Sequence, residues 1–184
     1  MDILTAVLTA IGLAACAGLR AFLPIFGAGL AARLVGWPLP PGLDPLASDT
    51  GLLIFGLATL VELAADKIPM VDNALDAIHT VVGPVAGVLM AYIPFSHLPV
   101  PYALALAVMT GATVAGGVHA LAATARVKSS ILTIGIANPL LSMIEDFLAI
   151  LTLAVTILAP ALLLAACAIA IFWVRRRRRS RVPA

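Results

Sequence analysis

Six ionisable residues stand in stretches of the chain that are otherwise apolar enough to cross a bilayer. They are Arg20, Glu62, Asp66, His119, Glu145 and Asp146. An ionisable side chain within a membrane span costs about 3 kcal/mol by insertion scales, so such groups rarely face lipid. We expect these residues to point inward, toward one another or toward water, and to mark a site.

Glu62 and Asp66 stand at i and i+4, one helical turn apart, and so share a face of a helix. Two carboxylates in a low-dielectric site repel each other, and one of them keeps its proton unless a cation lies between them. This spacing indicates a site for a proton or a cation. The alternative is a pair at the membrane interface, because Asp66 and Lys67 lie near the end of their apolar segment, where charges are ordinary.

A polar stripe is predicted near the start of a later helix. Asn138, Ser142 and Glu145 fall at i, i+4 and i+7, and Asp146 follows directly. Glu145 lies roughly 10 Å into this segment at 1.5 Å per residue. An acid at that depth favours a functional role.

The two bases Arg20 and His119 are the expected partners of Glu62 and Glu145. One interpretation gives these pairs a role in transport, and the other makes them internal ion pairs that hold packed helices together. The sequence leaves both interpretations open.

A further group, Asp72, Asp76 and His79, also falls at i, i+4 and i+7. Aliphatic residues occupy the opposite face, so the pattern predicts a short amphipathic helix over Asp72 to Val82 with an acidic stripe. One interpretation is a helix at the membrane surface with its polar side in water. The other is a metal site with two aspartates and one histidine, although the sequence identifies no particular metal.

Composition indicates an integral membrane protein. Hydrophobic residues make up 62% of the 184 residues and charged residues 11%, whereas soluble domains contain roughly half and roughly a quarter. Six of the eleven Lys and Arg residues are Arg175 to Arg179 and Arg181, and the rest of the chain has five bases and nine acids. We expect this tail to fix topology and bind anionic lipid headgroups rather than nucleic acid.

Proline, glycine and charge divide the chain into about six expected spans, so the predicted fold is all-α and polytopic. The first apolar run, Ile3 to Val35, is long for one span, and we expect a break near Pro24 to divide it. The stretch Ser129 to Ala137 is too short to cross and is expected to be broken or re-entrant. The other expected segments are Gly51 to Lys67, Asp72 to Val82 with Pro84 to Ile93, Tyr102 to Thr124, Asn138 to Ala159, and a last span from Pro160 to Trp173.

An internal repeat divides the membrane region in two. The segment Ala17 to Ala21 aligns with Gly116 to Ala120, and Val61-Glu62 aligns with Ile144-Glu145. Three spans in each half would make the halves run in opposite directions, as in inverted-repeat transporters. We therefore expect repeats over residues 1–96 and 97–174, a basic tail over 175–184, and a homodimer.

The positions of the bases predict the orientation in the membrane. The arginine tail is expected in the cytoplasm, and counting back through six spans places Lys67, Arg126 and Lys128 on the same side. The links Gly36 to Thr50 and Pro94 to Pro101 contain no Lys or Arg, as external loops should. Both termini are then cytoplasmic.

Three blocks of sequence carry a family resemblance: CAGLRAFLP from Cys16 to Pro24, ELAADKIPMVD from Glu62 to Asp72, and NPLLSMIED from Asn138 to Asp146. In this order they resemble the bacterial membrane family catalogued as domain of unknown function 4126, over nearly the whole chain up to the arginine tail. The resemblance implies that these blocks are positions common to the family, that the tail is peripheral, and that the location is a bacterial cytoplasmic membrane. It implies no activity.

Several catalytic signatures are absent from the sequence, including a Walker A loop, His-Glu-x-x-His, Gly-x-Ser-x-Gly and Cys-x-x-Cys. An ATP-driven pump or a conventional hydrolase is therefore not expected, and no cofactor is implied. We expect a small secondary transporter or channel-like permease for protons, cations or a small charged solute. The alternatives are a translocase for a lipid-linked phosphate with Arg20 at the headgroup, a non-transporting scaffold or assembly protein, and a metal-dependent intramembrane enzyme built on the group around Asp76.

Overall fold

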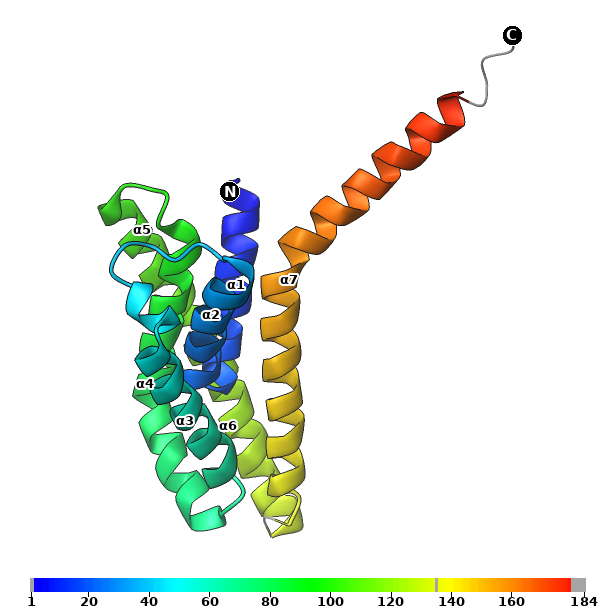
Figure 1. Ribbon diagram of the computed structural model, residues 1–184. Helices are drawn as coiled ribbons and strands as arrows, with labels where there is room; N and C mark the ends of the chain where they lie inside the picture. The colour runs from blue at the N-terminus through cyan, green and yellow to red at the C-terminus, as the bar shows by residue number, and fades with distance from the viewer. Residues whose placement is uncertain (1, 135, 180–184) are drawn as a thin grey trace.

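The computed structural model describes residues 2–134 and 136–179, with side chains described except at 69, 70, 72, 73 and 159–179. Every regular element in this part of the chain is helical (Figure 1). The elements are α1 (Ile3–Leu19), α2 (Phe22–Val35), η1 (Asp44–Ala47), α3 (Asp49–Ala65), α4 (Pro69–Phe95), α5 (Val100–Ala107), η2 (Val108–Ala112), α6 (Thr113–Thr133) and α7 (Asn138–Arg179). Among the described residues, three stretches are long and apolar enough to cross a membrane, namely Ala74–Phe95, Val100–Thr133 and Asn138–Leu158, and α1 and α2 are shorter apolar helices.

The break in the first apolar run falls at Arg20 and Ala21, within one turn of the proline predicted to cause it. Pro24 has no N–H to donate to the carbonyl group of Arg20, and its ring crowds that carbonyl, so one helix cannot run through both residues. Arg20 has an extended backbone, with φ −143° and ψ 110°. Pro24 lies in the first turn of α2, where the missing N–H is tolerated.

Helices α1 and α2 form a hairpin, so the chain enters the bundle and returns (Figure 1). Ala6, near the start of α1, packs in one cluster with Phe95 at the end of α4. Gly29 of α2 lies against Leu46 in the loop region before α3. The end of the bundle that contains Phe95 and the loop between α2 and α3 is called the loop end. The N-terminus therefore lies at the loop end, opposite the turn that carries Lys67. The expectation that the N-terminus shares a side with Lys67 is wrong for this arrangement.

Helix α4 is one helix of 27 residues rather than the two pieces expected. Pro84 and Pro94 lie inside it. Proline is tolerated in closely packed apolar helices because neighbouring helices and small local adjustments satisfy the carbonyl groups that it frees. The helix predicted over Asp72 to Val82 is therefore the first part of a long helix that packs against α1 and α6.

The next helical stretch also differs from its expected bounds. From Val100 to Thr133 the chain is continuously helical, through the wide π-type turn η2, instead of ending at Thr124. The separate short segment expected from Ser129 is its last turn. At η2 the chain approaches α4 closely, because a Cβ atom built on Gly111 would lie 2.6 Å from the Cα atom of Val88. Glycine is the residue that permits this crossing.

Helix α7 begins at Asn138, where the last but one span was expected to start, and Pro139 lies in its first turn. The helix continues past Pro160 to Arg179 instead of ending at the proline. The side chains of the expected sixth span and of the arginine tail lie outside the described residues.

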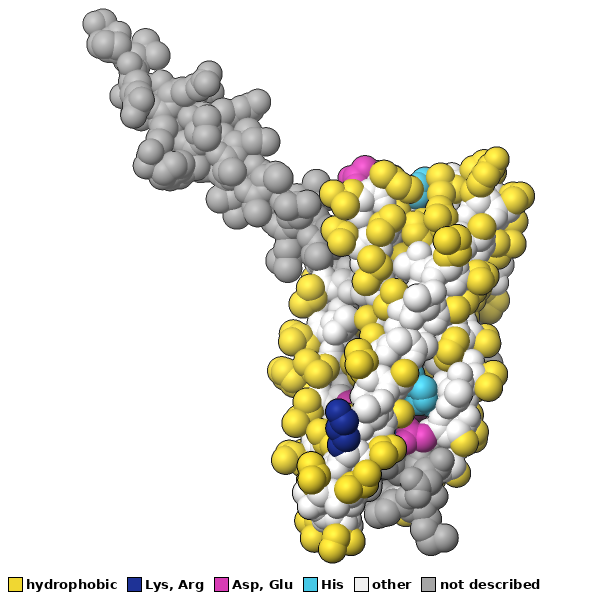
Figure 2. Space-filling view, turned by 180° about the vertical axis from the view of Figure 1, so that it is seen from behind, with side chains coloured by type: hydrophobic (Ala, Val, Ile, Leu, Met, Phe, Trp, Pro, Cys, Tyr) yellow, Lys and Arg dark blue, Asp and Glu magenta, His cyan; other side chains and the backbone are white. Residues whose placement is uncertain are grey.

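Small side chains make up much of the core, which lets the helices approach closely. The main cluster surrounds Leu13, Met90 and several alanines, and a second cluster around Phe95 fills the loop end of the bundle. Large aliphatic side chains such as Leu53 and Leu121 are exposed on the outside. Figure 2 shows hydrophobic side chains spread over one face, with few charged ones among them. An apolar exterior around a charged interior is the reverse of a soluble domain and indicates an apolar environment.

Candidate functional site

Arg20 is the centre of a buried network of ion pairs. Its side chain is fully buried, and its Nη1 lies 2.6 Å from Oδ2 of Asp66. Its Nε donates to Oδ1 of Asp146 at 2.7 Å, and its Nη2 donates to Oγ of Ser142 at 3.2 Å. Oε2 of Glu145 is 3.8 Å from Nη1. One guanidinium at the break after α1 therefore contacts both α3 and α7.

Arg126 of α6 is the second centre, although its sequence position suggested only a base at the end of a span. Its Nη1 lies 2.5 Å from Oδ1 of Asp76. Its Nε donates to Oε1 of Glu145 at 3.3 Å, and its Nη2 forms an ion pair with Oε2 of the same carboxylate. Nη2 is also 3.5 Å from Oδ2 of Asp66. The available signal was its spacing, because Arg126 stands seven residues after His119 and shares its helix face.

Lys67 supplies a third cation from the turn that follows α3. Its Nζ donates to Oγ of Ser142 at 2.7 Å and lies 2.5 Å from Oδ2 of Asp146. The Lys67 side chain is 37% exposed, whereas that of Asp66 is 2% exposed. The interfacial interpretation therefore fits Lys67 but does not fit Asp66.

Glu62 has different partners from Asp66, although the two acids are one turn apart. Its Oε1 accepts the backbone N–H of Ala21 at 2.7 Å, and its Oε2 accepts that of Phe22 at 3.2 Å. N–H groups at the start of a helix have no partner within their own helix. Oε1 of Glu62 also lies 2.6 Å from Nε2 of His79. Glu62 therefore caps α2 from a neighbouring helix and has a histidine as its ion-pair partner.

The second histidine lies beside the first. The rings of His79 and His119 meet edge to face, with centroids 6.0 Å apart, and Nε2 of His119 is 3.4 Å from Oγ1 of Thr80. His119 faces α4, so its hydrogen-bond neighbour is a hydroxyl group rather than an acid. The pairing expected between the two bases and the two glutamates therefore holds only for Arg20 with Glu145, at 3.8 Å.

A pocket of about 340 Å³ lies next to the network. It is lined by Asp76, Ala123, Arg126, Val127, Ser130, Ile131 and Asn138. Nδ2 of Asn138 donates to Oγ of Ser130 at 2.9 Å, while its Oδ1 is buried without a hydrogen-bond partner among the described atoms. Asn138 thus lines this pocket and is not in contact with Arg20, unlike Ser142 on the same predicted stripe.

The predicted acidic stripe on α4 is divided between two partners. Asp76 pairs with Arg126, and His79, which is buried, pairs with Glu62. Asp72 lies outside the described side chains. Among the described residues no group of three or more His, Cys, Asp or Glu side chains is arranged to hold a metal ion. The buried His79 contradicts a helix that lies on the membrane surface with this face in water.

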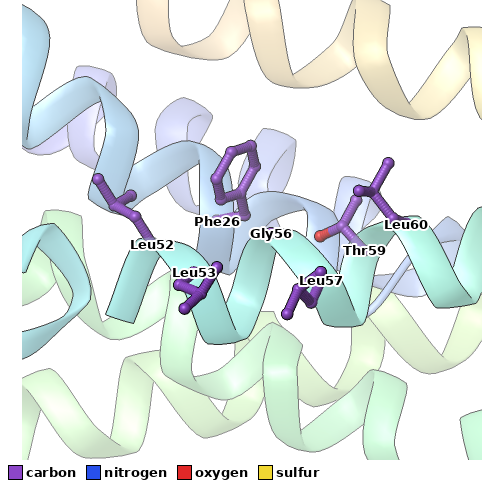
Figure 3. Close-up of a pocket in the computed structure, with 7 residues that line it drawn as sticks. All are labelled: Phe26, Leu52, Leu53, Gly56, Leu57, Thr59 and Leu60. Carbon is purple, nitrogen blue, oxygen red and sulfur yellow. The ribbon is translucent and has the colours of Figure 1, made fainter. Parts of the chain in front are cut away.

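An apolar pocket on the outside of α2 and α3 lies apart from these charges (Figure 3). Its volume is about 320 Å³, and it is lined by Phe26, Leu52, Leu53, Gly56, Leu57, Thr59 and Leu60. The hydroxyl group of Thr59 donates to the carbonyl oxygen of Phe55 at 2.8 Å, so it is already engaged. A lining of this kind offers nothing to orient a polar ligand, and the candidate site is the ion-pair network.

Together these features define a class of protein: the part of the chain that the structure describes is an all-helical bundle, with three helices of membrane-spanning length, that encloses a network of ion pairs. The chain belongs to the family described as "Domain of unknown function (DUF4126)", whose family model matches residues 7–179. The resemblance predicted from three blocks of sequence is thereby confirmed. The match ends at residue 179 and so includes the first five arginines of the tail. No curated protein and no solved structure matches the chain.

Proposed function

We propose that the protein is an integral membrane protein that acts as a small secondary transporter or channel-like permease for protons or cations. The observation that carries the proposal is an imbalance of charge in the network. Among the described side chains, five carboxylates lie in it or beside it, against three permanent cations, which leaves an excess of two negative charges when both histidines are neutral. The acids are Glu62, Asp66, Asp76, Glu145 and Asp146, and the cations are Arg20, Lys67 and Arg126. A cluster with this imbalance attracts protons and cations.

The depth of the network supports the proposal. Arg126 stands seven residues before the end of α6, which is roughly 10 Å along a helix axis. Ionisable groups at such depth in apolar helices are expensive and mark ion or proton pathways. The helix break beside Arg20 supports it further, because discontinuous helices surround the sites of many secondary transporters.

Access to the network differs at its two ends. The 340 Å³ pocket reaches Asp76 and Arg126 and has room for several waters at roughly 30 Å³ each. Toward the loop end, the cluster around Ala6, Phe95 and Ala107 is tightly packed. A pocket beside the network and a buried apolar cluster toward the loop end fit one state of an alternating-access cycle.

Several finer features belong to the same proposal. We place the end of the bundle that carries both Lys67 and Lys128 in the cytoplasm of a bacterial cell. We propose that the arginine tail binds anionic lipid headgroups. Two inverted repeats, residues 1–96 and 97–174, are supported by the matching positions of Glu62 and Glu145, although the break at Arg20 has no counterpart at His119 within α6. A homodimer fits a small chain with one set of repeats. No catalytic reaction and no cofactor is part of the proposal.

A non-transporting scaffold is the second candidate, and the geometry of the ion pairs favours it over the lipid-phosphate translocase. Arg20 is fully buried and already surrounded by acids, so it offers no free donors to a phosphate. Contacts among the hairpin, α3, α6 and α7 would also serve to hold the helices in a fixed arrangement.

The experiment that tests the proposal measures proton and cation flux into proteoliposomes. The variant is Glu62→Gln with Glu145→Gln, which removes two network charges while preserving side-chain size. The matched control is Asp44→Asn with Asp49→Asn, which removes two acids that are exposed near the loop end. Both variants are first shown to fold, by their unfolding temperature in detergent.

We expect flux in the wild type and in the control, and none in the folded network variant. Absence of flux in the folded wild type across pH and the common monovalent cations would overturn the proposal and favour the scaffold. Equal flux in wild type and network variant would place any pathway elsewhere in the protein.

A further inference from the structure

Glu62 is distinguished from the other acids of the site by its partner. Asp66, Asp76, Glu145 and Asp146 each lie within ion-pair distance of an arginine or a lysine. Among the described residues, the ion-pair partner of Glu62 is His79, with Nε2 and Oε1 2.6 Å apart and side chains 6% and 1% exposed. The charge of arginine or lysine is fixed near neutral pH, whereas that of histidine depends on whether it holds a proton.

The same carboxylate is bonded to the backbone of the hairpin. Both of its oxygens accept N–H groups, from Ala21 and Phe22, at the point where α2 begins. A negative charge at a helix N-terminus is stabilised by the helix dipole and by these donors. If Glu62 takes up a proton, that charge is lost and one of its oxygens becomes a poor acceptor, so the hold on α2 weakens.

Other charged and titratable groups face this pair from the surrounding helices. Cys16 of α1 is buried nearby and experiences the charge of Glu62, and Arg20 follows at the break. Asp66 follows one turn later, directly after α3, and Asp76 lies one turn before His79 along α4. From α6, His119 meets the ring of His79 and Arg126 reaches Asp76. From α7, Glu145 is held by Arg126.

We infer that Glu62 and His79 form a proton-binding pair, and that protonation of Glu62 releases the N-terminus of α2 at the helix break. The pair retains the cap while it holds one proton, because the imidazolium and the carboxylate then compensate each other. A second proton neutralises Glu62 and loosens its bonds to Ala21 and Phe22. Proton binding is thereby coupled to the hairpin that holds Arg20 in the network.

The use of this coupling in transport rests on the proposed function, but the coupling itself can be measured without flux. Residue-resolved hydrogen exchange of the full-length protein in detergent micelles gives protection factors for the amides of Ala21 and Phe22 across pH. These factors are corrected for intrinsic exchange and compared with amides in the middle of α1. ¹⁵N NMR of the histidine ring nitrogens follows the protonation of His79 in the same samples.

In the wild type we expect the protection of these two amides to fall roughly fivefold as pH is lowered, the size expected for loss of a helix cap, while the middle of α1 is unchanged. Glu62→Gln should show low protection at every pH. His79→Gln should move the fall to higher pH, because the positive charge beside Glu62 is gone. His97→Gln is the control, since its ring lies at the carbonyl oxygen of Pro94 near the loop end, and should resemble the wild type.

If the protection factors of the Ala21 and Phe22 amides in the wild type do not change with pH, the inference is overturned. This outcome holds even if Glu62→Gln fails to fold. An unchanged pH profile in His79→Gln would remove the histidine from the pair. A pH-dependent cap in a protein without flux would leave the inference standing and the transport proposal refuted. Flux together with a pH-independent cap would overturn the inference and leave the transport proposal standing.

Discussion

Arg20 and Asp66 form an ion pair in the interior of the bundle, with Nη1 and Oδ2 2.6 Å apart and side chains 0% and 2% exposed. The pair joins the break after α1 to the residue that follows α3. Asp146 and Lys67 extend it to α7 and to the solvent-facing end. Buried charges of this kind depend on one another, because removal of one leaves its partner unpaired in an apolar environment.

Arg20→Ala is expected to lower the free energy of unfolding by about 3–5 kcal/mol, since Asp66 and Asp146 would lose their shared partner. The measurement is denaturant unfolding in detergent. Arg33→Ala is the matched control, because Arg33 is exposed and pairs with the exposed Asp49, and it should cost at most about 1 kcal/mol. Equal losses in the two variants would mean that the buried network does not stabilise the fold.

Arg126→Lys is expected to destabilise the protein by about 2 kcal/mol although it keeps the charge. The guanidinium of Arg126 reaches Asp76 on α4 and both oxygens of Glu145 on α7, and a single ammonium group cannot reproduce that planar arrangement of donors. Lys128→Arg, at an exposed position two residues away, should change stability by less than about 0.5 kcal/mol. Thermal unfolding of both variants makes the comparison, and a well-tolerated Arg126→Lys would show that charge alone matters there.

Gly111→Ala and Gly117→Ala should have opposite effects on stability. A Cβ atom on Gly111 would lie 2.6 Å from the carbonyl carbon of Gly87 and from the Cα atom of Val88, so α4 and η2 must separate, at a cost of about 1–3 kcal/mol. A Cβ atom on Gly117 meets no described atom within 4 Å, and alanine in a helix is favoured over glycine by about 1 kcal/mol. Unfolding temperatures measured side by side would contradict the close crossing if both variants gained stability.

The features that could be predicted from sequence are those that depend on neighbouring residues. Composition predicted an apolar, all-helical chain, and Pro24 predicted the break because the missing N–H acts on the carbonyl four residues earlier. The start of α7 at Asn138 and Pro139 followed from the same kind of local rule. Pro84 misled the prediction for α4, because packing against other helices outweighs the lost hydrogen bond.

The sequence predicted which ionisable residues are buried more reliably than which of them pair with each other. Buried ionisable residues such as Arg20 and Asp66 were identified because an unpaired charge in an apolar segment is expensive. The partners of His79 and Arg126 were not predicted, because the burial of each depends on helices distant in sequence. The spacing of Arg126 from His119 was the one local signal.

The sequence alone determined that the chain is helical and apolar, that it breaks near Pro24, and that it carries ionisable groups which must avoid lipid. These properties follow from backbone chemistry and from transfer free energies, which act residue by residue. Only the tertiary structure decided that α1 and α2 form a hairpin, that Asp66 pairs with arginine and that Glu62 caps α2. Two acids one turn apart on a helix are equivalent in sequence, and the helices that pack against each of them determine its partner.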